Sequence, residues 1–140
     1  SEISLLKGLP GVEAVLSDGA LAKFTFRMSD EEKAASRVLH DDNLRRAFGL
    51  VSVPAEGTAA CEGSLLVLDE GLDALRAGLL DESLSREVMA WAAGADRCEA
   101  VVTGHSLPDF VAEAADYLTR FSCERHPYQH GVAAREGIEY

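Results

Sequence analysis

Two short apolar segments, each closed by polar residues, constrain the fold of this chain most strongly. The first covers residues 64–68 and is followed by Asp69 and Glu70, and the second covers residues 99–103 and is followed by Gly104. Short runs of this kind are typical of strands buried on both faces of a parallel sheet. We therefore predict two such strands.

Helical sequence precedes and separates these strands. Ser29 and Glu32 have the spacing of a capping box, and the apolar residues that follow predict an amphipathic helix over residues 29–48. A second helix is predicted over residues 84–94, where Gly94 provides a stop signal. These two helices are expected to pack against the sheet.

A third helix is expected after the second strand. Ser106 and Asp109 repeat the capping-box spacing, and Phe110, Val111 and Ala114 are predicted to face inward. Shorter elements are predicted as a helix end over residues 1–8, extended segments over residues 12–16, 21–27 and 115–119, and a flexible surface loop over residues 53–63.

This alternation of strands and helices predicts the fold class. It indicates an α/β domain with a mainly parallel sheet and helices on both faces. The chain has 140 residues and 47% hydrophobic content, which is sufficient for a single domain over residues 1–140.

The charge and the cysteine content indicate which binding partners and which cellular compartment to expect. Thirteen basic and twenty-four acidic residues give a net charge of −11, which disfavours nucleic acid and anionic membranes and leaves small molecules or proteins. Three widely spaced cysteines fit a reducing cytoplasm. The chain begins with Ser1, from which we expect that an upstream segment was removed or left out.

Candidate site residues follow the two predicted strands, because ligands of open α/β sheets bind beyond the carboxyl ends of the strands. Asp69 and Glu70 resemble a Walker B segment that reaches Mg²⁺, and the alternative is that these carboxylates cap a helix. Thr103, Gly104 and His105 offer a hydroxyl, a closely approachable backbone and an imidazole, and the alternative is an ordinary turn.

Two further groups have competing interpretations. Cys123, His126 and His130 have a spacing that suits zinc, although such loop histidines more often make hydrogen bonds to backbone or solvent. Phe24 and Phe26 would share one face of a strand, either as ordinary core residues or as an aromatic wall for a flat ligand.

Several motifs together resemble a known family. In order they are residues 5–8 (LLKG), 24–26 (FTF), 65–70 (LLVLDE), 101–104 (VVTG), 115–116 (AD), 126–127 (HP) and 137–140 (GIEY). Their order and approximate spacing resemble the ATP:corrinoid adenosyltransferases of the P-loop type. The resemblance implies a P-loop (RecA-like) fold, a homodimer, and transfer of the 5′-deoxyadenosyl group of ATP to the reduced cobalt of a corrinoid such as cobalamin.

The resemblance also implies roles for individual residues. Glu70, with Asp69, corresponds to the Mg²⁺ ligand, and Thr103-Gly104, followed by His105, corresponds to part of the nucleotide pocket. Phe24 and Phe26 correspond to the aromatic pair that packs against the corrin. The implied mechanism depends on positioning and has no catalytic nucleophile from the protein.

The sequence departs from the family pattern in three places. It contains no G-x-x-x-x-G-K-[ST] phosphate loop, His105 stands where the family usually has Arg, and Phe26 stands where it usually has Trp. We expect a P-loop fold without its first βα unit, inactive or weakly active in this form, or a degenerate paralogue. The alternatives are a non-catalytic corrinoid- or nucleotide-binding module and a metal-stabilised interaction domain.

Overall fold

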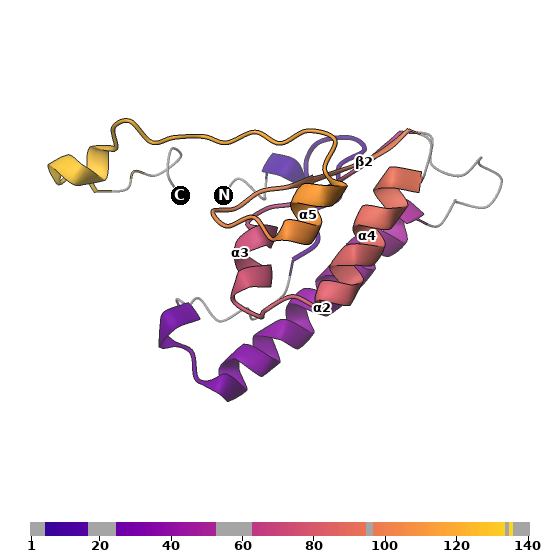
Figure 1. Ribbon diagram of the computed structural model, residues 1–140, viewed down its shortest axis with the longest axis horizontal. Coiled ribbons are helices and arrows are strands. Elements are labelled where there is room, and N and C mark those ends of the chain that lie inside the picture. The colour runs from indigo at the N-terminus through magenta and orange to yellow at the C-terminus, as the bar shows by residue number, and fades with distance from the viewer. Residues whose placement is uncertain (1–4, 17–24, 53–62, 95–96, 134, 136–140) are drawn as a thin grey trace. The chain divides into compact units, whose positions relative to one another are not determined.

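The computed structural model describes residues 5–16, 25–52, 63–94, 97–133 and 135. The chain divides into two compact units, one formed by Ser1–Val15 with Tyr117–Tyr140 and the other by Leu16–Asp116. The larger unit carries the sheet and four of the described helices: α2 (Asp30–Ser52), α3 (Gly71–Arg76), α4 (Glu82–Gly94) and α5 (Asp109–Ala114) (Figure 1). Within the described residues, no helix combines the length and apolar character that a membrane span needs.

The sheet of the larger unit consists of two parallel strands. β1 (Ser64–Leu68) pairs with β2 (Cys98–Val102) in a register that places Leu68 opposite Val102. Both strands and their parallel arrangement confirm the prediction. Parallel pairing brings the two carboxyl ends to the same edge of the sheet.

The prediction that both faces of the sheet are buried is wrong for the described residues. Leu66 is buried at 6% exposure, whereas Leu65 and Val67 on the opposite face are each 54% exposed. In the larger unit α2 packs on β1 and α4 on β2, and the two helices lie side by side (Figure 1). Both helices therefore pack on the same face of this two-stranded sheet.

The core lies between this covered face and the two helices. Val88 of α4 has no exposed surface and packs in a cluster with Leu44, Leu66, Leu80 and Leu84. At its margin the rings of Phe48 and Trp91 meet edge to face, with centroids 5.6 Å apart.

The start of α2 has the predicted capping box. The Ser29 backbone N–H donates to Glu32 Oε2 over 2.7 Å, and the Glu32 backbone N–H donates to Ser29 Oγ over 3.2 Å. The helix extends to Ser52, past the predicted end at Phe48. α4 also has its predicted end at Gly94.

A second network fastens α2 to the start of α4. Asp41, which is 8% exposed, accepts a hydrogen bond from the Asp81 backbone N–H over 2.7 Å. Asp81 in turn accepts from the Leu84 backbone N–H over 2.9 Å and pairs with Arg37. The hydrogen bond from the Leu84 N–H and then that from Arg37 hold the pKa of Asp81 below its ordinary value.

Several predicted local elements are wrong. Residues 12–16 and 115–119 form no strand, and residues 25–27 form the short 3-10 helix η1 (Thr25–Arg27) instead of an extended segment. α5 starts later than predicted, because Pro108 occupies its N-cap position in place of Ser106. Val111 faces inward as predicted, whereas Ala114 is exposed.

The smaller unit contains little regular structure in its described residues. Its 3-10 helix η2 (Pro127–His130) begins after His126, whose side chain accepts a hydrogen bond from the Tyr128 backbone N–H over 3.1 Å. Leu5 and Leu6 are helical, within the helix end predicted over residues 1–8, and residues 1–4 lie outside the described residues. The predicted loop over residues 53–63 falls, apart from Gly63, outside the described residues.

Candidate functional site

The parallel pairing places Asp69 and Thr103 side by side at the carboxyl edge of the sheet. The backbone hydrogen bonding continues one residue past β2, since the Thr103 backbone N–H donates to Leu68 O over 3.1 Å. The Thr103 hydroxyl donates to Asp69 Oδ1 over 3.0 Å. Two of the predicted site segments therefore meet directly, although 34 residues separate them.

Glu70 turns the chain from β1 into α3. Its backbone is left-handed, with φ 53° and ψ 21°, and its backbone N–H donates to Thr103 Oγ1 over 2.9 Å. The Thr103 hydroxyl therefore accepts one hydrogen bond and donates another. Glu70 occupies the N-cap position of α3, but its side chain caps no backbone group. Glu70 and Asp69 are both exposed residues.

Gly104 allows the loop after β2 to lie directly on α3. Its φ is +148°, which L side chains rarely adopt, and a Cβ atom there would lie 2.7 Å from Leu72 Cβ and 2.8 Å from Asp73 Oδ2. The Leu72 backbone N–H also donates to Thr103 O over 3.1 Å. Close packing of this loop on α3 thus requires glycine here.

Asp73 contacts the candidate site at His105 and was not predicted from the sequence. It lies in the first turn of α3, and its Oδ2 accepts from the His105 backbone N–H over 2.9 Å and lies 3.0 Å from His105 Nδ1. The bond to the imidazole, followed by that to the backbone, holds the pKa of Asp73 below its ordinary value of 3.8. The available signal was a third carboxylate four residues after Asp69 in the sequence DEGLD.

The predicted corrinoid residues are only partly described. Phe24 lies outside the described residues. Phe26 lies in η1, so the argument that strand geometry directs both rings to one face does not apply. The Phe26 side chain is 77% exposed, and the Arg27 guanidinium carbon lies 5.4 Å from its ring centroid.

A zinc cluster at Cys123, His126 and His130 finds no support in the described residues. No group of three or more His, Cys, Asp or Glu side chains in that part of the chain is placed to hold a metal ion. His126 accepts a backbone hydrogen bond instead, as the alternative interpretation expected.

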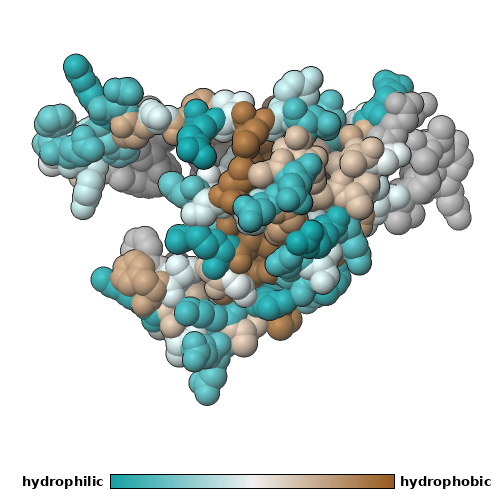
Figure 2. Space-filling view, viewed as in Figure 1, coloured by the Kyte–Doolittle hydropathy of each residue, from teal (hydrophilic) through white to brown (hydrophobic). Residues whose placement is uncertain are grey.

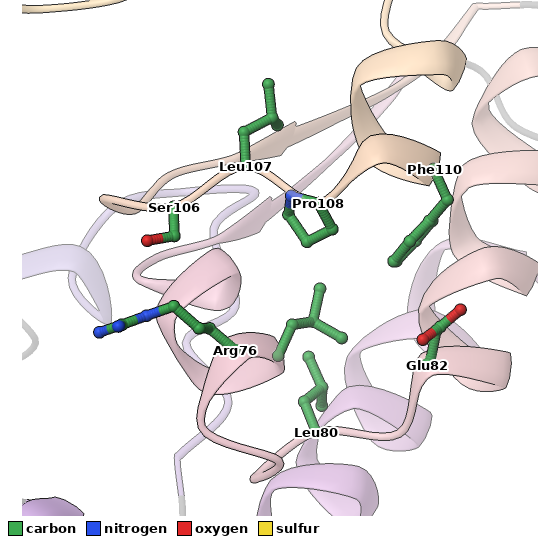
Figure 3. Close-up of a pocket in the computed structure, with 8 residues that line it drawn as sticks. Arg76, Leu80, Glu82, Ser106, Leu107, Pro108 and Phe110 are labelled. Atoms are coloured by element: carbon green, nitrogen blue, oxygen red, sulfur yellow. The ribbon is translucent and has the colours of Figure 1, made fainter.

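A pocket of about 360 Å³ lies beside the strand-end residues, between α3, the start of α4 and the loop that leads into α5 (Figure 3). Its lining residues are Leu75, Arg76, Leu80, Glu82, Ser106, Leu107, Pro108 and Phe110. Pro108, Phe110 and Leu80 point into it, whereas the Arg76 side chain extends away (Figure 3). Figure 2 shows apolar surface in this part of the face.

None of the predicted site residues lines this pocket. Its interior is apolar, and the one carboxylate at its edge, Glu82, is hydrogen-bonded by Arg86 over 2.7 and 2.9 Å. The Arg86 guanidinium carbon in turn lies 4.2 Å from the Phe110 ring centroid. The pocket is therefore suited to an apolar group, whereas the carboxylates and the hydroxyl of the candidate site lie at the strand ends.

Comparison with known proteins identifies the family. A family model described as ATP:corrinoid adenosyltransferase BtuR/CobO/CobP matches residues 1–140. The chain belongs to this family. The candidate site residues that follow β1 and β2 therefore belong to a member of this family.

A curated relative supports this membership. The chain is 29% identical over 117 residues to a protein of Pseudomonas aeruginosa named corrinoid adenosyltransferase, a match that covers 84% of this chain and 52% of the relative. The chain thus spans about half the length of that relative. No solved structure matches the chain.

The Thr103 hydroxyl gives a first test of the site's structure. We expect Thr103→Val to lower the free energy of unfolding by about 1 kcal/mol, because the Glu70 N–H and Asp69 Oδ1 each lose a partner. Thr103→Ser is the control, since it keeps the hydroxyl. Urea unfolding of the two variants measures the difference, and equal stabilities would show that the two hydrogen bonds contribute nothing.

Proposed function

We propose that this protein transfers the 5′-deoxyadenosyl group of ATP to the Co(I) centre of a corrinoid. The observation that carries the proposal is the family match along residues 1–140. The name of the Pseudomonas aeruginosa relative supports it. The strand-end pair of Asp69 and Thr103 supplies polar groups where α/β sheets bind nucleotides.

The proposed step is a nucleophilic displacement at the ribose C5′ atom. Co(I) supplies both electrons of the new cobalt–carbon bond, the bond between C5′ and its oxygen breaks, and triphosphate leaves with the electron pair of that bond. The cobalt is formally oxidised to Co(III). A separate reductant must supply Co(I). The protein's contribution would be to align C5′ above the cobalt and to stabilise the leaving triphosphate.

The strand-end residues fit the nucleotide and Mg²⁺ roles in this proposal. Mg²⁺ is usually held by one or two carboxylates together with substrate phosphates, which matches the exposed pair Asp69 and Glu70. No larger cluster of metal-ligating side chains occurs in the described part of the chain. Thr103, Gly104 and His105 would contact the nucleotide from the neighbouring strand end.

The corrinoid role is assigned to Phe24 and Phe26. The exposed ring of Phe26 supports it, because an accessible aromatic face can pack against a flat macrocycle. The proposal also includes a cytoplasmic homodimer. We assign no protein nucleophile, since Co(I) is itself the attacking group.

The function is tested by adding ATP, Mg²⁺ and chemically reduced cobalamin to the purified protein under anaerobic conditions. The expected result is a cobalt–carbon product, detected by its absorption spectrum and its cleavage by light, together with equimolar triphosphate. Omission of ATP is the control. Complete absence of product in the presence of all three reactants would refute the assignment.

A non-catalytic corrinoid- or nucleotide-binding module is the second candidate. The polar groups at the strand ends and the exposed Phe26 residue support it, because both can bind a ligand without any chemical step. Calorimetric titration separates the two functions. Saturable corrinoid binding without consumption of ATP would favour the binding module.

A further inference from the structure

The contact between Asp73 and His105 joins two segments 32 residues apart in the sequence. A single oxygen, Asp73 Oδ2, lies 2.9 Å from the His105 backbone nitrogen and 3.0 Å from its Nδ1 atom. The Asp73 side chain is 24% exposed and the His105 side chain is 85% exposed. The carboxylate is thus held in the structure while most of the imidazole faces outward.

The chemistry of the pair fixes which ring nitrogen carries the proton. The lowered pKa of Asp73 keeps its carboxylate ionised at neutral pH, and an ionised carboxylate only accepts hydrogen bonds. Nδ1 of His105 must therefore be the protonated nitrogen. Nε2 remains as the second contact point of the ring, an acceptor in neutral imidazole and a donor in imidazolium.

Other contacts keep the pair in place. Gly104 packs against Leu72 Cβ and the Asp73 backbone nitrogen, and the Asp73 N–H donates to Glu70 O over 3.1 Å. Arg76 is a cation beside the pair, and its Nη2 atom lies 4.0 Å from Asp73 Oδ1. Asp69 and Glu70 are further charged residues at this strand edge. Both segments that hold the pair are therefore fixed by backbone contacts as well.

We propose that Asp73 is a positioning residue that holds the His105 ring at Nδ1 so that Nε2–H of its imidazolium form donates to a phosphate oxygen of the nucleotide. The inference rests on the proposed function for the identity of the ligand. A histidine held at Nδ1 by a carboxylate has one orientation and one tautomer, so little ordering remains for the ligand to impose. His105 would then replace a fixed guanidinium with an imidazole whose direction Asp73 determines.

The first experiment measures the tautomer directly in the wild-type protein. In protein labelled with ¹⁵N at histidine, long-range spectra distinguish the two ring nitrogens, and His105→Gln assigns the signal among the four histidines. We expect the neutral ring to carry its proton on Nδ1 at pH 8, and we expect inorganic triphosphate to shift the Nε2 resonance at pH 6, where imidazolium offers an Nε2–H donor. An Nε2–H tautomer, or no shift up to about 10 mM triphosphate, would overturn the inference.

The second experiment compares triphosphate binding at pH 6 by Asp73→Asn, His105→Gln and the double variant. We expect each single variant to weaken binding about tenfold and the double variant to be no weaker, because Asp73 acts through His105. Asp42→Asn is the matched control, since Asp42 is an exposed carboxylate of α2 paired with Arg45, and its affinity is expected to stay unchanged. Additive losses, or wild-type affinity in Asp73→Asn, would contradict the proposal.

The outcomes separate this inference from the proposed function. Triphosphate binding at Nε2 without any cobalt–carbon product would retain the role of Asp73 and refute the transferase. Product formation that is unchanged in Asp73→Asn would support the transferase and refute the role of Asp73. A loss of folded structure in Asp73→Asn, seen by circular dichroism, leaves the decision to the tautomer measurement and to His105→Gln.

Discussion

Gly104→Ala is expected to lower the free energy of unfolding by about 2–4 kcal/mol, one of the two largest effects we predict for a single substitution. The added methyl group would lie 2.7 Å from Leu72 Cβ, and φ of +148° is strained for any residue with a Cβ atom. Both costs arise where the loop after β2 crosses α3. Urea denaturation followed by tryptophan fluorescence, with Trp91 as the probe, measures the change.

Gly49→Ala is the matched control and is expected to act in the opposite direction. Gly49 lies inside α2, and a Cβ atom there would meet nothing within 4 Å. The substitution should therefore raise the free energy of unfolding by up to about 1 kcal/mol through helix propensity alone. If both variants were equally stable, the close approach of the 103–105 loop to α3 would be wrong.

Features of the fold encoded by adjacent residues were predictable from the sequence. The capping box of Ser29 and Glu32 depends on residues three positions apart, and both of its hydrogen bonds occur in the structure. The two strands were predictable because a short apolar run closed by polar residues has few other stable conformations. Their parallel pairing followed from the helical sequence between them.

Features that depend on distant residues were not predictable in the same way. The apolar character of Leu65 and Val67 indicated burial, but whether a strand face is covered depends on which other elements pack there. The 3-10 turn at Phe26 and the late start of α5 reflect local alternatives that similar short patterns also allow. Short segments have too few residues for periodicity to decide between them.

The same distinction between local and distant contacts applies to the candidate site. Asp69 and Thr103 could be predicted as neighbours because the carboxyl ends of parallel strands share an edge. Asp73 could not, because a carboxylate in a first helical turn usually complements the helix dipole in solvent. Asp73 Oδ2 reaches His105 because the loop at Gly104 lies directly on α3.

These contacts make the strand-end edge a hydrogen-bonded frame. Glu70 and Thr103 are joined by one hydrogen bond, Leu72 and Thr103 by a second, and Asp73 and His105 by two more. A reaction that depends on aligning two substrates benefits from such a frame, because a small displacement of the reacting atoms lowers the rate sharply. The frame accordingly supports the transferase proposal on physical grounds.

Leu66→Ala is the other substitution expected to have a large effect, with a loss of about 2–5 kcal/mol in the free energy of unfolding. Leu66 is 6% exposed and packs in the core cluster with Leu44, Leu84 and Val88. Truncation would leave a cavity between the sheet and both long helices. Thermal and urea unfolding of the variant measure the loss, and far-UV circular dichroism checks that the helices remain.

Leu65→Ala provides the comparison, since Leu65 is the neighbouring residue of the same strand and points to the opposite face. It is 54% exposed, so removal of the same atoms should cost less than about 1 kcal/mol. The ratio between the two losses therefore reports which face of the sheet is covered in solution. Equal losses would mean that Leu65 is buried as well, and would contradict the one-sided packing of α2 and α4 on this sheet.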